Sequence, residues 1–218
     1  MEELQKEIER IRREQEELVF AAFDEETAWE TGKRLRQTAL EKGYAVAISV
    51  TLNRRRLFAC AMAGTTPIND EWIRRKENTV YKFFKSSYEM SLYMKLKGDS
   101  IGPRYGLEDG LYAAAGGAVP VCVKGAGIVG TVTVSGLAEH EDHALVVSVL
   151  REMIAEETAG GARVIEMEMK TGTVARRNLR GCFRFLLFIG RGYLHMDYCS
   201  KWPWILSTKA FSANGIIS

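Results

Sequence analysis

The first eighteen residues carry a helical pattern of apolar positions on an otherwise charged segment. Apolar side chains recur every third or fourth residue, which places them on one face of a helix: Leu4, Ile8, Ile11 and Leu18. The stripe is narrow, so it offers one packing face only. We predict a helix over residues 2–18 that packs either on its own domain or on another subunit.

A second helical segment follows, and both of its ends carry capping signals. Asp24 can accept backbone N–H groups at the start of the helix, and Gly43 is suited to a left-handed stop. The same period returns late in the chain, where an apolar face begins just after Glu141 and Asp142. We therefore predict one helix between Asp24 and Gly43 and another that begins near Glu141 or Asp142.

Residues 69–85 are predicted to form a long helix. Its apolar positions recur every three or four residues: Trp72, Ile73, Val80, Phe83 and Phe84. Asn69 or Asp70 is the expected cap, and Trp72 is expected in the core. The Ser86-Ser87 pair should end the helix, because serine hydroxyls compete for backbone hydrogen bonds.

Four segments are rich in β-branched and small apolar residues, as strands are. They fall into two pairs, each joined by a polar or glycine-rich turn: 44–51 with 56–62, and 118–124 with 128–135. Hairpins, rather than alternating strands and helices, indicate an antiparallel sheet with helices packed on it. The predicted fold class is α+β.

The composition is typical of a soluble globular protein with one main domain. The chain has 218 residues, of which 46% are hydrophobic and 27% charged, and no apolar run reaches the roughly 18 residues that span a bilayer. The charged N-terminus is unlike a signal peptide, and the four cysteines show no close paired spacing. We predict a cytoplasmic protein with reduced thiols, in which Cys60 and Cys122 are buried and inert.

Charge divides the chain near residue 159. Residues 1–159 have 21 Lys/Arg and 25 Asp/Glu, a net charge of −4, whereas residues 160–218 have nine and three, a net charge of +6. The acidic body argues against a nucleic-acid partner. The basic C-terminal extension shows no sustained periodicity beyond one short apolar run, so we expect it to be irregular and dispensable for folding.

Three motifs carry a resemblance to a known family: NDEWIRRK at 69–76, GGAVPV at 116–121, and GIVGTVTVSGL followed by DHALVV between 127 and 147. Through them the chain resembles the GlcG/HbpS-like proteins, the haem-degrading-domain superfamily. Within that group it is most similar to the uncharacterised small cytosolic branch found in bacteria and fungi. The resemblance covers residues 14–157. It implies a profilin-like α+β domain that assembles into homo-oligomers; it makes haem a candidate cofactor and transfers no agreed catalytic residues.

His143 and Asp142 are the first candidate site residues, at the start of the last predicted helix. Adjacent helical residues point about 100° apart, so these two side chains are not expected to pair. His140 and His143 are a weak metal signature, because the position four residues after His143 is Val147, and no metal site is predicted. His143 either meets a backbone carbonyl in the first turn, with few core contacts, or binds a ligand.

The start of the 69–85 helix is the second candidate. Asn69 and Asp70 either serve as caps or line a polar pocket, where backbone N–H groups would hold a carboxylate or phosphate. Arg75 and Lys76, one turn further on, would add positive charge to such a pocket.

Gly116 and Gly117 are the third candidate. They are either turn residues or part of a ligand-binding loop, although they lack the strand-then-helix context of a dinucleotide motif. Ser135 is not expected to be a nucleophile, because no G-x-S-x-G pattern surrounds it.

These features favour an oligomeric binding or assembly module, and they leave open whether any reaction is catalysed. The alternative is a sensor or enzyme for haem or another small anionic ligand. The expected partners are copies of the same chain and a small ligand, with neither nucleic acid nor membrane.

Overall fold

The chain divides into two compact units, Met1–Glu157 and Thr158–Ser218. The computed structural model describes residues 1–171, 174–177, 183–189, 192–198, 208–212 and 215–216, with side chains described through residue 159.

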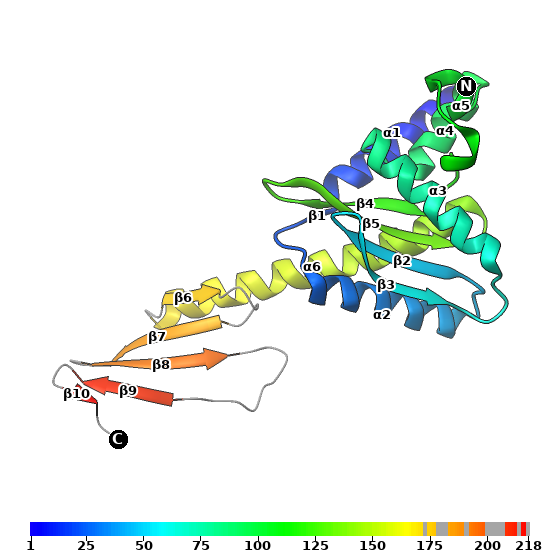
Figure 1. Ribbon diagram of the computed structural model, residues 1–218. Helices are drawn as coiled ribbons and strands as arrows, with labels where there is room; N and C mark the ends of the chain where they lie inside the picture. The colour runs from blue at the N-terminus through cyan, green and yellow to red at the C-terminus, as the bar shows by residue number, and fades with distance from the viewer. Residues whose placement is uncertain (172–173, 178–182, 190–191, 199–207, 213–214, 217–218) are drawn as a thin grey trace. The chain divides into compact units, whose positions relative to one another are not determined.

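The first unit is a five-stranded sheet with helices on both faces (Figure 1). The strands are β1 (Val19–Phe20), β2 (Ala47–Leu52), β3 (Arg55–Ala61), β4 (Ala118–Val123) and β5 (Gly127–Ser135), in the order β1-β4-β5-β2-β3. The helices are α1 (Glu2–Glu17), α2 (Glu25–Lys42), α3 (Pro67–Phe83), α4 (Ser87–Lys97), α5 (Ile101–Tyr105), the 3-10 helix η1 (Asp109–Leu111) and the start of α6 (Glu139–Thr171). The predicted α+β class is confirmed.

The predicted strand pairs are also confirmed. β2 pairs antiparallel with β3 and β5, and β4 pairs antiparallel with β5. The sheet is not wholly antiparallel, however, because β1 pairs parallel with β4, with Val19 opposite Cys122. The sequence pattern missed β1, since two residues are too few to show an alternation.

The two faces of the sheet differ in chemistry. Toward α2 and α6 the strands present aliphatic side chains that are at most 1% exposed: Ile48, Val50, Val119, Val121, Val132 and Val134. Toward α3 they present small polar side chains that are also buried: Ser49, Thr51, Thr131, Thr133 and Ser135. The contacts with α3 are hydrogen bonds, since Ser49 Oγ donates to Glu77 (2.6 Å) and the hydroxyls of Thr51 and Tyr81 are 2.6 Å apart. The core is therefore aliphatic on one side of the sheet and polar on the other, where Thr133 Oγ1 has no hydrogen-bond partner among the described residues.

The apolar stripe of α1 packs within its own domain. Ile8 and Ile11 are buried against Tyr88 and Leu92 of α4. Two roles were predicted for this stripe, and the structure shows the first, packing on its own domain.

The capping signals of α2 are confirmed. Asp24 accepts a hydrogen bond from the Thr27 N–H, and Gly43 ends the helix in the left-handed conformation with φ +66°. α3 ends at Phe83, and Ser86 caps α4, so the predicted break is also present.

Two helix starts differ from the prediction. Thr66, not Asn69 or Asp70, is the N-cap of α3, and Asn69 instead accepts the backbone N–H of Thr66 at 2.9 Å. Thr66 and Asn69 thus form a capping box, which allows the helix to begin earlier than its apolar pattern does. α6 begins at Glu139 rather than at Glu141 or Asp142.

The C-terminal part has regular structure where an irregular extension was predicted. α6 runs to Thr171, and five strands follow in an antiparallel sheet of order β10-β9-β8-β7-β6. These are β6 (Val174–Arg177), β7 (Phe183–Ile189), β8 (Gly192–Tyr198), β9 (Thr208–Ser212) and β10 (Gly215–Ile216). Only β7 is apolar enough to be recognised as a strand from the sequence, because the other strands mix aromatic, charged and small residues without alternation.

We expect the first unit to fold without residues 159–218. Its main core cluster contains no residue beyond Ile154 among the described side chains, and the unit ends at Glu157. A chain that ends after Thr158 should melt within about 2–4 °C of the full chain, the shift that about 1 kcal/mol produces at this size. Thermal unfolding followed by circular dichroism would measure this. A fall of about 10 °C would show that the second unit supports the first.

Candidate functional site

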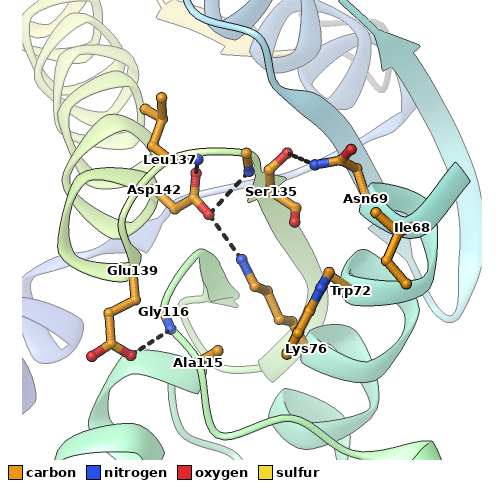
Figure 2. A pocket seen from close by; sticks show the side chains of 11 residues that line it. Ile68, Asn69, Trp72, Lys76, Ala115, Gly116, Ser135, Leu137, Glu139 and Asp142 are labelled. Carbon is orange, nitrogen blue, oxygen red and sulfur yellow. Dashed lines mark hydrogen bonds and ion pairs between the residues drawn. The ribbon is translucent and has the colours of Figure 1, made fainter. Parts of the chain in front are cut away.

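A pocket of about 320 Å³ opens beside the start of α3, the loop before β4 and the start of α6 (Figure 2). Four of the residues singled out in the sequence line it: Asn69, Lys76, Gly116 and Asp142. The remaining lining residues are Ile68, Trp72, Ala115, Ser135, Gly136, Leu137 and Glu139. The structure thus brings parts of all three sequence candidates to one place.

Lys76 and Asp142 form a buried ion pair in the lining. Lys76 Nζ lies 2.9 Å from Asp142 Oδ2, and the two side chains are 4% and 2% exposed. Nζ also donates to the Val134 carbonyl at 3.0 Å, and Asp142 accepts the backbone N–H groups of Leu137 (3.0 Å) and Gly136 (3.3 Å). The pair therefore connects α3, the end of β5 and the start of α6 (Figure 2).

Burial works against both charges of this pair. It lowers the pKa of Lys76 and raises the pKa of Asp142, in each case outweighing the attraction between the two groups. A lysine ammonium has three N–H donors, and two of them are used by Val134 and Asp142. Among the described residues, one donor of Lys76 is left for a bound molecule.

Glu139 adds an acceptor to the lining. Its carboxylate accepts hydrogen bonds from Ser91 Oγ (2.6 Å) and the Gly116 N–H (3.3 Å), and it pairs with Lys95. Burial opposes ionisation of Glu139, but these partners outweigh it, and the pKa of Glu139 is lowered. Through Glu139 of α6, the loop before β4 is thereby connected to α4 as well as to α6.

Gly116 and Gly117 allow close backbone contacts next to the ion pair. A Cβ at Gly117 would lie 2.3 Å from the Val134 carbonyl oxygen and 2.8 Å from Lys76 Nζ, and its φ is +123°. A Cβ at Gly116 would lie 2.0 Å from the Glu139 carbonyl oxygen. These contacts therefore support a packing role for Gly116 and Gly117 beside the pocket.

We expect Gly117→Ala to lower the free energy of unfolding by about 2 kcal/mol, because it adds strain at positive φ to a clash with Val134. Urea unfolding would measure the loss. Gly125→Ala is a matched control, since Gly125 also has positive φ (+79°) but has no atom within 4 Å of the added Cβ. Equal losses in the two variants would show that the close approach at Gly117 contributes nothing.

His143 lies outside the pocket lining and is buried, at 4% exposure. Its Nε2 is 2.8 Å from Glu14 Oε1 of α1, and its ring centroid is 5.0 Å from that of Tyr88. The prediction of a backbone-carbonyl partner and few core contacts is wrong. Glu14 is 129 positions away in the sequence, so no local pattern could have indicated this partner. As predicted, His143 does not pair with Asp142.

Glu14 is the centre of a small charged cluster. Besides His143 it pairs with Arg10 (3.3 Å) and Arg151 (3.2 Å). Burial opposes its ionisation, but His143 and the two arginines outweigh burial and lower the pKa of Glu14. Because an ionised carboxylate can only accept, His143 Nε2 is the donor, and Nδ1 has no partner among the described residues.

Two other assignments at the start of α3 need correction. Asp70 is exposed and does not line the pocket. Trp72, predicted in the core, is 38% exposed and lines the pocket, with the Arg75 guanidinium 4.1 Å from its ring centroid.

The two cysteines of the first unit are half-buried rather than fully buried. Burial raises the pKa of the Cys122 thiol, which keeps it in the less reactive protonated form. Within the residues whose side chains are described, no group of three His, Cys, Asp or Glu residues could hold a metal ion. Of the described helices, none is both long and apolar enough to cross a membrane.

Fold and pocket together define a class of protein: an α+β domain with one mixed sheet, helices on both faces, and a small polar pocket where the central strand β5 ends. The chain belongs to the family described as haem degrading protein HbpS-like, whose model matches residues 23–151. The resemblance inferred from the motifs is thus confirmed.

Relatives that match along most of their own length support the assignment. The chain is 44% identical over 154 residues to a UPF0303 protein from Rhizobium etli (strain CIAT 652), covering 71% of this chain and 93% of the relative. It is 44% identical over 147 residues to a UPF0303 protein from Acidobacterium capsulatum, covering 67% of this chain and 89% of the relative.

Solved structures share the fold. The crystal structure of the Ybr137w protein matches with a TM-score of 0.63 and 28% identity, covering 69% of this chain and 89% of that one. A double mutant of HbpS from Streptomyces reticuli matches with a TM-score of 0.50 and 18% identity, covering 61% of this chain and 87% of that one. The second likeness concerns the fold alone.

The residues of this pocket do not fit haem. Haem iron is held in proteins by His, Cys, Met or Tyr, and the lining contains none of these. His143 is turned toward Glu14 and is absent from the lining. The family description alone therefore does not identify what this pocket holds.

Proposed function

We propose that the protein is a cytoplasmic, homo-oligomeric binding module that holds a small hydrogen-bonding molecule in the pocket beside Lys76. The observation that carries the proposal is a buried lysine, in the lining of an open pocket, with one donor left uncommitted. No reaction is part of this proposal.

Several kinds of group converge on the pocket, as they do in small-molecule sites. Lys76 and the Asn69 amide offer donors, Glu139 offers an acceptor, and Trp72 and Ile68 offer apolar surface. The volume of about 320 Å³ is near the lower end of the range for ligand pockets, roughly 300–1,000 Å³. A compact ligand is therefore favoured.

The charged side chains of the lining indicate the charge of the ligand. The lining holds two carboxylates, Glu139 and Asp142, and one cation, Lys76. A strongly anionic ligand would face both carboxylates, so a neutral, hydroxylated molecule fits better than the anionic one expected from the sequence.

The proposal is tested by the fluorescence of Trp72, because a ligand in the pocket would contact this side chain. A panel of small hydroxylated and carbonyl compounds should include one that changes the fluorescence saturably. Trp72→Phe should abolish the change, whereas Trp29→Phe, which replaces an exposed tryptophan outside the lining, should preserve it. If no compound gives a Trp72-dependent change, or if Trp72→Phe retains the change, the proposal is wrong.

Haem binding is the second candidate function, and the family description is what favours it. A haem titration would decide. A Soret band that saturates at one haem per chain and is lost in His143→Ala or in His140→Ala would make haem the ligand. We expect no such saturation, because the lining offers no axial ligand.

We expect a homo-oligomer, as the family resemblance implies. Ile68 and Trp72, one turn apart on α3, are 55% and 38% exposed at the pocket, and a second copy would cover such apolar surface. Light scattering at micromolar concentration should give a mass that is a multiple of the chain mass, both for the full chain and for residues 1–158. A monomeric mass in both would contradict the expectation.

A further inference from the structure

Lys76 is the one fully buried lysine among the side chains that the structure describes. It nevertheless belongs to the lining of an open pocket. A lysine amine in water is ordinarily protonated, and in that form it is a poor nucleophile. A desolvated lysine in a pocket is the setting in which proteins use the free amine.

Asp142 is placed to exchange a proton with this amine. Its Oδ2 lies 2.9 Å from Lys76 Nζ, and its carboxylate is held in position by the N–H groups of Gly136 and Leu137. Burial lowers the pKa of Lys76 and raises the pKa of Asp142, so both changes favour the pair in its uncharged form. Proton transfer from Lys76 Nζ to Asp142 would give a free amine next to a carboxylic acid.

We propose that Lys76 binds its ligand covalently, forming a Schiff base with a small hydroxylated aldehyde or ketone that enters the pocket, and that Asp142 carries the protons. The proposal rests on the proposed function of the pocket and specifies its ligand class.

The bond changes balance without any further reactant. Lys76 Nζ first gives a proton to Asp142, and its lone pair then attacks the carbonyl carbon, so that a C–N bond forms and the carbonyl oxygen becomes an alkoxide. The alkoxide takes the proton of Asp142, and Nζ returns one of its own protons to the carboxylate. Asp142 then protonates the hydroxyl group, which leaves as water while the nitrogen lone pair forms the C=N bond.

The sum is one lysine ammonium and one carbonyl compound giving one iminium and one water. Asp142 ends as a carboxylate beside a cation, as it began, so the buried charges are the same before and after. No oxidant or reductant is required.

The other lining residues select the ligand. The Asn69 amide donates to the Ser135 carbonyl at 3.3 Å and has a second N–H to offer, and Glu139 can accept from a hydroxyl. Trp72 provides a flat wall for the carbon skeleton. These groups suit a short chain bearing a carbonyl and one or more hydroxyls.

The test uses the full chain with glycolaldehyde as the probe and sodium borohydride as the trap, which reduces an imine to a stable secondary amine. Peptide mass mapping then shows which lysines carry the adduct. We expect Lys76 to be modified first and saturably, ahead of the exposed Lys95 and Lys97. Asp142→Asn should slow the modification of Lys76 roughly a hundredfold, the scale of lost proton transfer, and leave the exposed lysines unchanged.

Peptide mass mapping of the natural chain tests the proposal even if Asp142→Asn fails to fold. Modification that follows exposure, with Lys76 the least modified, would overturn the proposal and leave the pair a structural one. Trp72 fluorescence in the same samples separates the two proposals. A saturable, Trp72-dependent change without an adduct at Lys76 would preserve the binding function and reject the Schiff base.

Discussion

Replacing Lys76 with methionine is expected to lower the free energy of unfolding by about 3–5 kcal/mol. The loss arises because Asp142 would remain as a buried carboxylate without its cation, which is the costly way to break a buried ion pair. Asp142 is 2% exposed as a side chain, so its carboxylate would be left poorly solvated. Urea unfolding of the variant and the natural chain would measure the difference.

Two further variants separate this effect from lost packing. Lys33→Met makes the same substitution in an exposed pair, where Lys33 lies 2.9 Å from Glu30 with 56% and 41% exposure, and it should cost less than about 1 kcal/mol. Lys76→Met combined with Asp142→Leu removes both charges and should recover a large part of the loss. If Lys76→Met were as mild as Lys33→Met, the pair would not stabilise the fold.

His143→Ala is expected to cost about 3 kcal/mol, the scale of truncating a large buried side chain. The variant removes the contact with Tyr88 and one of the hydrogen bonds that hold Glu14. Because Glu14 belongs to α1, the loss should be concentrated in the attachment of that helix. Urea unfolding would give the total, and hydrogen exchange would show faster exchange in residues 2–17.

His140→Ala is the matched control for this prediction, since His140 is exposed on the same helix. It should change stability by less than about 0.5 kcal/mol, as surface substitutions usually do. A loss below about 1 kcal/mol in His143→Ala, with exchange in α1 unchanged, would mean that the Glu14–His143 contact does not hold the helix.

What the sequence predicted well depends on residues that are close together in the chain. Asp24 and Gly43 bound α2 because each signal acts on backbone groups within one turn. The hairpins β2–β3 and β4–β5 were visible because their turns are short and their strands rich in β-branched residues. Such features need no knowledge of the tertiary structure.

What the sequence did not predict depends on residues that only folding brings together. Lys76 and Asp142 were each singled out, but 66 positions separate them, and no spacing rule could join them. The partner of His143 was missed for the same reason. Trp72 was assigned to the core because a large aromatic residue is usually buried, whereas the pocket is what keeps it at the surface.

The chemical difference between the two faces of the sheet has a consequence for misfolding. Along the end of β5 the residues alternate as Thr131, Val132, Thr133, Val134 and Ser135. If β5 slipped by one residue against β2 or β4, every hydroxyl would turn into the aliphatic layer and every valine would face Glu77 and Tyr81. A buried hydroxyl without a partner costs about 1–3 kcal/mol, and several would be misplaced together. Mispaired hairpins, which could otherwise persist as traps or exchange strands between chains, are thereby made much less stable than the native pairing.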